Sequence, residues 1–345
     1  MYSKMILKIS IAFFLFLGFQ AISCAQVSPR WVSRFNGTGD YSDKINCLMP
    51  DGTGNFYLAG YTVKTGQNRD FMLLKVNSTG DTIWMRTYNG TGNGADEILS
   101  MALDNSGNIG VTGIQKGDGT SDDILTLKYN PQGVLLWANV YNYLSNEDDQ
   151  GNCIAFDADG NALVTGQSDS DPSATGNDDY ITIKYNSAGQ QLWANRFNGT
   201  GNTTDRAVKV LTSTDGSVYI TGRSANLDDD DYVTIKYTPG GTQIWKLLYD
   251  GGEGDDRAVD MVLDASGNAY ITGRSDNGDD DDYITIKYSS AGTQQWVKQY
   301  DGTGAGDDRP TAICLGPDGS VLVTGQSDVA LGTAENDNFI NIKYN

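Results

Sequence analysis

Aspartates in pairs and longer runs dominate the chemistry that this sequence offers. They crowd the segments NLDDDDY (226–232), GGEGDD (251–256) and DNGDDDDY (276–283). Clustered carboxylates can bind a hard cation such as calcium, or a pair of them can act as acid and base in glycoside cleavage. A solvated acidic surface without metal is the competing interpretation. The candidate metal ligands taken from these segments are Asp228, Asp230, Asp255, Asp256, Asp279 and Asp281.

Three arginines stand at equivalent places, each directly after an aspartate. A guanidinium group can hold a carboxylate through two parallel hydrogen bonds, so an arginine cluster can bind an acidic ligand. The alternative is a ladder of ion pairs between neighbouring repeat units, because the Asp-Arg step recurs. The candidate ligand-binding residues are Arg206, Arg257 and Arg309.

Composition removes several classes of function. The chain has no histidine, so Ser-His-Asp and Cys-His nucleophiles and histidine-ligated zinc are excluded. Its 44 acidic residues outnumber 24 basic ones, which argues against nucleic acid, whose phosphates need a basic surface.

The elements that must position these residues come from an internal repeat. A tryptophan marks each copy, at Trp31, Trp84, Trp137, Trp193, Trp245 and Trp296. The fifth copy shows four strand-like runs, over 257–264, 268–275, 281–288 and 293–300. A tandem repeat of four short antiparallel strands, about 50 residues long, is typical of a β-propeller blade.

The two ends of the repeat region predict how the ring closes. The sixth copy stops at Asn345 without its fourth strand, whereas RWVSRFNG (30–37) reads as a fourth strand without a blade. We therefore predict an all-β, six-bladed propeller of four-stranded antiparallel blades, in which the N-terminal strand completes the last blade and removes an exposed edge. The tryptophans are expected to pack between neighbouring blades.

Strand order also predicts where the acid lies. The connections from fourth to first strand and from second to third strand emerge on one face of each blade, and they hold most of the 44 acidic residues. The sequence therefore predicts one anionic face.

The repeat resembles a known family through two stretches. These are W-x3-Y-[ND]-G, as in WMRTYNG (84–90) and WVKQYDG (296–302), and D-x-x-G-N-x-x-[VI]-T-G, as in DNSGNIGVTG (104–113) and DASGNAYITG (264–273). They resemble the secreted bacterial β-propeller (SBBP) repeats and the related delta-60 type. The resemblance implies a secreted or surface propeller and supplies no catalytic residues.

Residues 1–25 read as a secretory signal, with Lys4 and Lys8 before an apolar run and the small-residue segment AISCAQ. Cleavage after Ala25 would leave a propeller domain over 26–345. The alternative is lipidation of Cys24. Either outcome predicts a secreted or cell-surface protein, with the periplasm as a further alternative, and the rest of the chain has no transmembrane segment.

Two hypotheses of function follow. The first is a monomeric, non-enzymatic binding or scaffold protein whose acidic face binds calcium or another cation, and a protein or carbohydrate ligand. The alternative is a polysaccharide hydrolase or lyase with paired carboxylates near the channel mouth.

Overall fold

The computed structural model describes residues 30–37, 41–64, 68–119, 121–143, 147–169, 177–201, 203–226, 229–252, 254–278, 280–302, 306–328 and 337–345. The signal segment predicted over residues 1–25 lies outside these ranges. The chain divides into two compact units, Met1–Val32 and Ser33–Asn345. All 23 strands belong to the second unit, and the described residues contain no helix that could cross a membrane.

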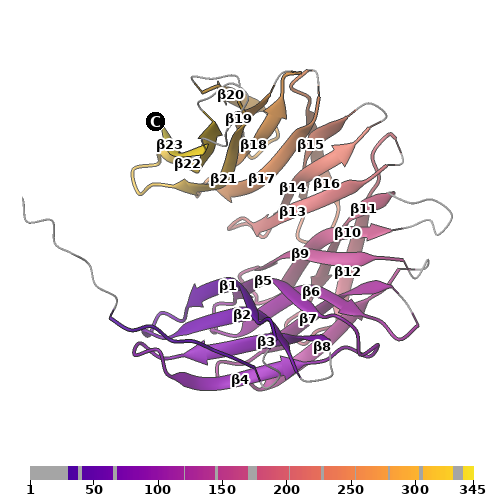
Figure 1. The fold of residues 1–345 in the computed structure, drawn as a ribbon. Coiled ribbons are helices and arrows are strands. Elements are labelled where there is room, and N and C mark those ends of the chain that lie inside the picture. Colours follow the sequence, from indigo (N-terminus) through magenta and orange to yellow (C-terminus); the bar gives the residue numbers. More distant parts are fainter. Residues whose placement is uncertain are drawn as a thin grey trace, which may run out of the picture. The chain divides into compact units, whose positions relative to one another are not determined.

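The strands form six antiparallel sheets that follow one another in chain order (Figure 1). The first sheet contains β1 (Lys44–Pro50), β2 (Phe56–Val63), β3 (Arg69–Val76) and β4 (Thr82–Tyr88). The second contains β5 (Glu97–Leu103), β6 (Ile109–Lys116), β7 (Asp122–Tyr129) and β8 (Leu135–Tyr141). The third contains β9 (Asp149–Phe156), β10 (Ala162–Asp169), β11 (Asp178–Tyr185) and β12 (Gln191–Phe197).

The remaining sheets repeat this order. The fourth contains β13 (Asp205–Thr212), β14 (Val218–Ala225), β15 (Asp230–Tyr237) and β16 (Gln243–Tyr249). The fifth contains β17 (Asp256–Leu263), β18 (Ala269–Asp276), β19 (Asp281–Tyr288) and β20 (Gln294–Tyr300). The sixth contains only β21 (Asp308–Leu315), β22 (Val321–Asp328) and β23 (Asp337–Tyr344).

The D-x-x-G-N stretches form the turns between first and second strands. In the second sheet, the Oδ1 atom of Asp104 accepts the backbone N–H groups of Ser106 and Asn108, both at 2.9 Å. Gly107 follows with a φ of 77°, a left-handed conformation that favours glycine. The repeated motif is therefore a turn motif: its aspartate satisfies backbone donors and its glycine reverses the chain.

Consecutive sheets are joined by apolar side chains. The first strand of each sheet contacts the first strand of the next, and five hydrophobic clusters each draw on two neighbouring sheets. We number the five junctions from the first, between sheets one and two, to the fifth, between sheets five and six. The third strands of sheets two to five (β7, β11, β15 and β19) are buried along almost their whole length, because each of these sheets has a neighbour on both faces.

Five of the six tryptophans, from Trp84 to Trp296, lie in these junctions, as the sequence predicts, whereas Trp31 is exposed. The Nε1–H group of Trp84 donates to the carbonyl of Pro131 in the next sheet at 3.2 Å. Trp245 donates in the same way to Ser290 at 3.2 Å. A Cβ atom on Gly133 would lie 2.9 Å from the Trp84 ring, so the turn glycine allows the close approach.

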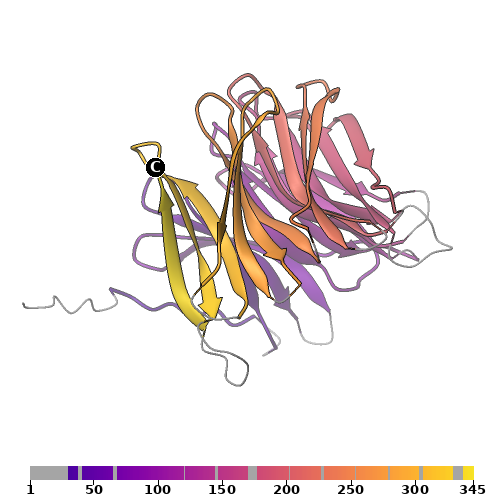
Figure 2. The same ribbon diagram turned by 90° about the horizontal axis from the view of Figure 1, so that it is seen from above.

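The sixth sheet differs from the others. Residues 30–37 form no strand, so the predicted closure by an N-terminal strand is not observed. β23 is the outer strand of its sheet (Figure 2). Phe339 of β23 is 78% exposed, whereas Tyr283, at the matching register position of β19, is fully buried.

Candidate functional site

The acidic loops gather at one end of each sheet. Because the strands of every sheet are antiparallel and in sequence order, the connections from fourth to first strand and from second to third strand lie at the same end. We call this the acidic end. The turns between first and second strands lie at the opposite end.

Two of the three candidate arginines bridge neighbouring sheets at the acidic end. Arg257 of β17 donates from Nε to Asp230 of β15 at 2.5 Å, and Arg223 binds the same carboxylate. Arg257 also reaches Asp255 at 2.5 Å. Asp230 therefore has two guanidinium partners, and its charge is compensated within the protein.

The fifth junction repeats this arrangement. Arg309 of β21 donates from Nε to Asp281 of β19 at 2.7 Å, and Arg274 binds the same carboxylate. Arg309 also pairs with Asp307. Asp230 and Asp281, predicted as metal ligands, are thus engaged in ion pairs between sheets, and Asp255, predicted likewise, pairs with Arg257 of the strand that follows it.

Arg206 lies in a different environment. Its Nε atom has no hydrogen-bond partner among the described residues. Burial lowers the pKa of Arg206, and the nearby charges of Arg223 and Arg257 act in the same direction. Asp178, which occupies in β11 the place of Asp230, accepts instead from Gln167 at 2.7 Å. A role in ligand binding for Arg206, Arg257 and Arg309 remains a prediction.

An aspartate at the start of the first strand recurs as a buried carboxylate. One oxygen accepts a backbone N–H group from the preceding loop, as Gly199 donates to Asp205 at 2.6 Å and Gly251 to Asp256 at 2.5 Å. The other oxygen of both aspartates makes no hydrogen bond of good geometry within the described part of the chain, and the hydroxyl groups of Ser224 and Ser275 lie near the two carboxylates. Burial raises the pKa of Asp205 and of Asp256 to about 6.

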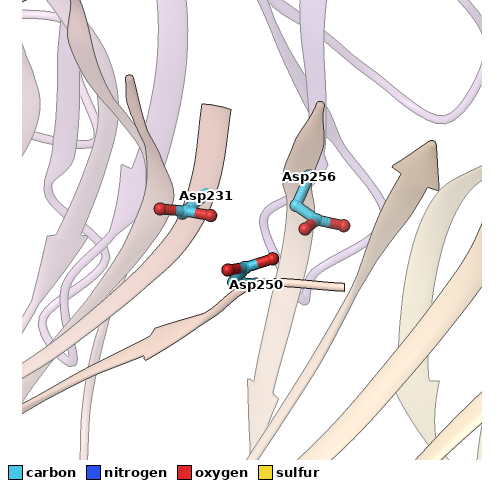
Figure 3. A group of neighbouring side chains, drawn as sticks. All are labelled: Asp231, Asp250 and Asp256. Carbon is cyan, nitrogen blue, oxygen red and sulfur yellow. The ribbon is translucent and has the colours of Figure 1, made fainter. Parts of the chain in front are cut away.

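Three carboxylates converge at the fourth junction (Figure 3). Asp231 comes from β15, Asp250 from the loop after β16, and Asp256 from β17 of the next sheet. One oxygen atom of each lies within 4.8 Å of the other two. Asp231 and Asp256 are buried, 7% and 0% exposed, while Asp250 is exposed to solvent.

The fifth junction holds a second group of the same construction. Asp282 of β19, Asp301 after β20 and Asp308 of β21 again place one oxygen each within 4.8 Å of one another. Asp282 and Asp308 are buried, 1% and 0% exposed, and Asp301 is exposed. The two groups therefore share burial pattern and element origin.

Only one predicted metal ligand, Asp256, belongs to these groups. Asp228 and Asp279 lie outside the described residues, and the other three form the ion pairs above. The sequence does carry a signal for the groups. The position that follows the fourth strand is Asn89, Asn142 and Asn198 in the first three copies but Asp250 and Asp301 in the next two.

The opposite end carries recurring Lys-Asp pairs. The Nζ atom of Lys128 lies 2.8 Å from Asp104 and donates to the carbonyl of Gly160 in the next sheet at 2.9 Å. Hydrogen bonds from Lys128 and Asn108 outweigh the effect of burial and lower the pKa of Asp104. Cavities of about 170, 240 and 290 Å³ lie beside the equivalent lysines Lys128, Lys236 and Lys75. These cavities recur with the repeat, so none of them singles out an asymmetric active site.

Comparisons with known proteins agree on the fold. No protein-family model matches the chain, and no curated protein matches it. The structure of a periplasmic gluconolactonase from Pseudomonas aeruginosa is similar, with a TM-score of 0.53, 12% identity, and coverage of 92% of this chain and 91% of that one. A calcium-binding protein, regucalcin, from Agrobacterium tumefaciens matches with a TM-score of 0.40 and 12% identity over 84% of this chain and 83% of its own.

The fold class is therefore all-β, with repeated antiparallel sheets arranged as in β-propellers. At this level of identity the gluconolactonase shows the fold alone. The resemblance to SBBP repeats stays a prediction.

Proposed function

We propose that this chain is an exported, non-enzymatic β-propeller that works as a binding or scaffold protein through its acidic end. The observation that carries the proposal is the repetition of the charged contacts. The Asp230 and Asp281 ion pairs and the two aspartate groups recur from one junction to the next. A catalytic centre needs one asymmetric arrangement, whereas a repeated surface suits a binding partner that meets many equivalent contacts.

The partners that this end favours are cations, calcium among them, and basic protein surfaces. The net charge is -20, and carboxylates that crowd one end attract positive ligands over about a Debye length of 8 to 10 Å. Binding to a basic protein should therefore weaken steeply as salt is added.

We further propose that the ring closes through the N-terminal segment. The register of β19 with β20 pairs Thr285 with Lys298, and the same register would pair Asn341 of β23 with Ser33. The exposed Phe339 would then be covered. A cavity of about 380 Å³ beside Trp296 and Tyr344 lies where the other tryptophans meet the turn of the next sheet.

An engineered disulfide tests closure. By the proposed register Ser33 would face Asn341, so S33C combined with N341C should form a cross-link that reductant removes. The control combines S33C with T285C, which lies on β19 of the preceding sheet. Cross-linking of the control to the same extent would contradict the register.

The proposed binding function is tested on the purified mature chain, whose N-terminus after export should be Gln26. Calcium binding is measured by calorimetry, binding of cytochrome c serves as the basic-protein probe, and hydrolysis of gluconolactone and of acidic polysaccharides is assayed in parallel. We expect calcium binding and salt-sensitive cytochrome c binding without turnover. Turnover that is lost on substituting a carboxylate at the acidic end would overturn the non-enzymatic proposal.

A further inference from the structure

We propose that Asp231, Asp250 and Asp256 form one calcium site and that Asp282, Asp301 and Asp308 form a second, each joining two neighbouring sheets. This inference rests on the proposed cation binding by the acidic end and gives it two defined places. It is more specific than a general attraction of cations, because it predicts two calcium ions per chain, each bound by three carboxylate oxygens at one junction.

The buried carboxylates are oriented as ligands rather than as members of an internal network. In the fourth junction, Asn226 holds the Oδ2 atom of Asp231 at 3.0 Å, and Gly251 holds the Oδ2 atom of Asp256 at 2.5 Å. The Oδ1 atoms of both side chains are buried without a hydrogen-bond partner among the described residues. Leaving a buried charged oxygen without a partner costs free energy, so a ligand at this point would remove that cost.

In the fifth junction, too, each buried carboxylate has one hydrogen-bonded oxygen and one oxygen without a bond. Asn277 and Gln299 hold the Oδ2 atom of Asp282 at 2.8 and 2.6 Å, and Gly302 holds the Oδ2 atom of Asp308 at 2.5 Å. Both Oδ1 atoms again have no partner in the described part of the chain. Two independent junctions thus present the same pair of unsatisfied oxygens beside an exposed third carboxylate.

The two groups differ from the neighbouring aspartates in their charge partners. Among the described residues, none of the six aspartates forms an ion pair with lysine or arginine. This contrasts with Asp230 and Asp281, one residue earlier in each strand, which have two arginine partners each. A divalent cation supplies the charge that the chain itself does not provide.

The spacing allows a calcium ion. Oxygens that bind one calcium ion at about 2.4 Å can lie up to about 4.8 Å apart. The oxygens of each group lie within 4.8 Å of one another. The exposed Asp250 and Asp301 leave space for the water ligands that complete a calcium shell of six to eight oxygens.

The test uses the full mature chain, stripped with chelator and titrated with calcium by calorimetry at neutral pH. We expect calcium to bind at both junctions in the parent protein, at the fifth junction alone in D250N, and at neither junction in D250N/D301N. These substitutions introduce the asparagine that three other copies carry at the same position, so folding should be preserved. The matched control is D159N, an exposed aspartate at the opposite end, which should keep both sites.

A spectroscopic readout separates site loss from misfolding. Terbium bound at the two junctions should be sensitised by Tyr249 and Tyr300, the residues before Asp250 and Asp301. This emission should fall in D250N and be lost in D250N/D301N, while circular dichroism is unchanged. Unaltered calcium stoichiometry in D250N/D301N would place cation binding elsewhere on the acidic end and overturn the two sites only. Absence of calcium binding in the parent protein would overturn the proposed cation binding as well.

Discussion

The third and fourth sheets balance the same buried carboxylate in two ways. In the third sheet, Arg196 of β12 binds the Oδ2 atom of Asp179 at 2.8 Å and the carbonyl of Ser168 at 2.6 Å, and its guanidinium lies over the ring of Tyr143, in the connection from the second sheet. In the fourth sheet, Leu248 takes the place of Arg196, because Leu248 pairs with Val233 of β15 as Arg196 pairs with Ile181 of β11. Asp250 takes the place of Asn198. The third sheet thus supplies its own cation and lacks the third carboxylate, whereas the fourth sheet lacks the arginine and has the carboxylate.

The comparison indicates that the same backbone arrangement lets the buried carboxylate of the third strand be neutralised either by an arginine of the chain or by a bound cation. The fifth junction supports this, because Gln299 takes the place of Arg196 and Asp301 the place of Asn198. Burial of Asp179 and its partners in a sheet junction costs free energy unless the charge is compensated. Four predictions can break or sharpen the comparison.

The largest effect is expected on removing the internal cation. R196L leaves the buried Asp179 carboxylate without its partner, and breaking a buried ion pair in this way costs about 3 to 5 kcal/mol. The free energy of unfolding from urea titration measures the loss. R196K, which retains the charge, should recover part of it, and a loss under about 1 kcal/mol in R196L would show that Arg196 does not compensate the junction.

The second largest effect is the pH dependence of stability that Asp205 causes. Burial raises the pKa of Asp205 from its usual value of 3.8 to about 6, so the folded state holds this proton more tightly than the unfolded chain does. Protonated Asp205 therefore contributes fully to the free energy of unfolding below about pH 4, and this contribution is lost as pH rises to about 6. The difference is at most about 3 kcal/mol.

D205N should remove this dependence. Relative to the parent protein, the variant should gain stability above about pH 6 and lose that gain below about pH 4, as measured by urea unfolding across the range. Asparagine can still accept the Gly199 N–H group, so the loop contact is kept. An equal stability difference at all pH values would assign the effect to packing instead of charge.

The fold was largely predictable because each copy repeats the same strand and turn residues. The predicted run 281–288 coincides with β19, and 257–264 differs from β17 (Asp256–Leu263) by one residue at each end. Alternation of apolar and polar residues and the turn glycines determine these bounds locally. Closure by residues 30–37 was also predicted, but these residues form no strand, because pairing between two distant segments is not determined by local patterns.

The site was predicted less well, because consecutive aspartates point in different directions. Asp230 and Asp231 are neighbours in β15, yet one meets an arginine of its own sheet and one of the next sheet, and the other meets Asp250 and Asp256. Side chains alternate between the faces of a strand, so a run of four aspartates does not reveal which member meets which partner. The replacement of asparagine by Asp250 and Asp301 was the more informative signal.

The third prediction transfers the internal cation to the fourth junction. L248R should place a guanidinium beside Asp231, as Arg196 lies beside Asp179, and it should reduce the calcium stoichiometry from two to one. At a calcium concentration of 100 Kd each site contributes about 2.7 kcal/mol, so the calcium-induced rise in Tm should shrink accordingly. L248M, of similar size and uncharged, is the control, and two intact sites in L248R would contradict the equivalence of the junctions.

The smallest effect comes from converting the third junction into the calcium type. N198D alone adds a carboxylate while Arg196 still occupies Asp179, so it should gain no calcium site. R196L/N198D removes the guanidinium and presents Asp179, Asp205 and the new carboxylate together, which predicts three calcium ions per chain by calorimetry. At ten times Kd the added site should restore about 1.4 kcal/mol of the stability lost in R196L. Calcium binding by N198D alone would mean that the arginine and the ion do not exclude one another, and the contrast between the junctions would then lie in backbone geometry, not in charge.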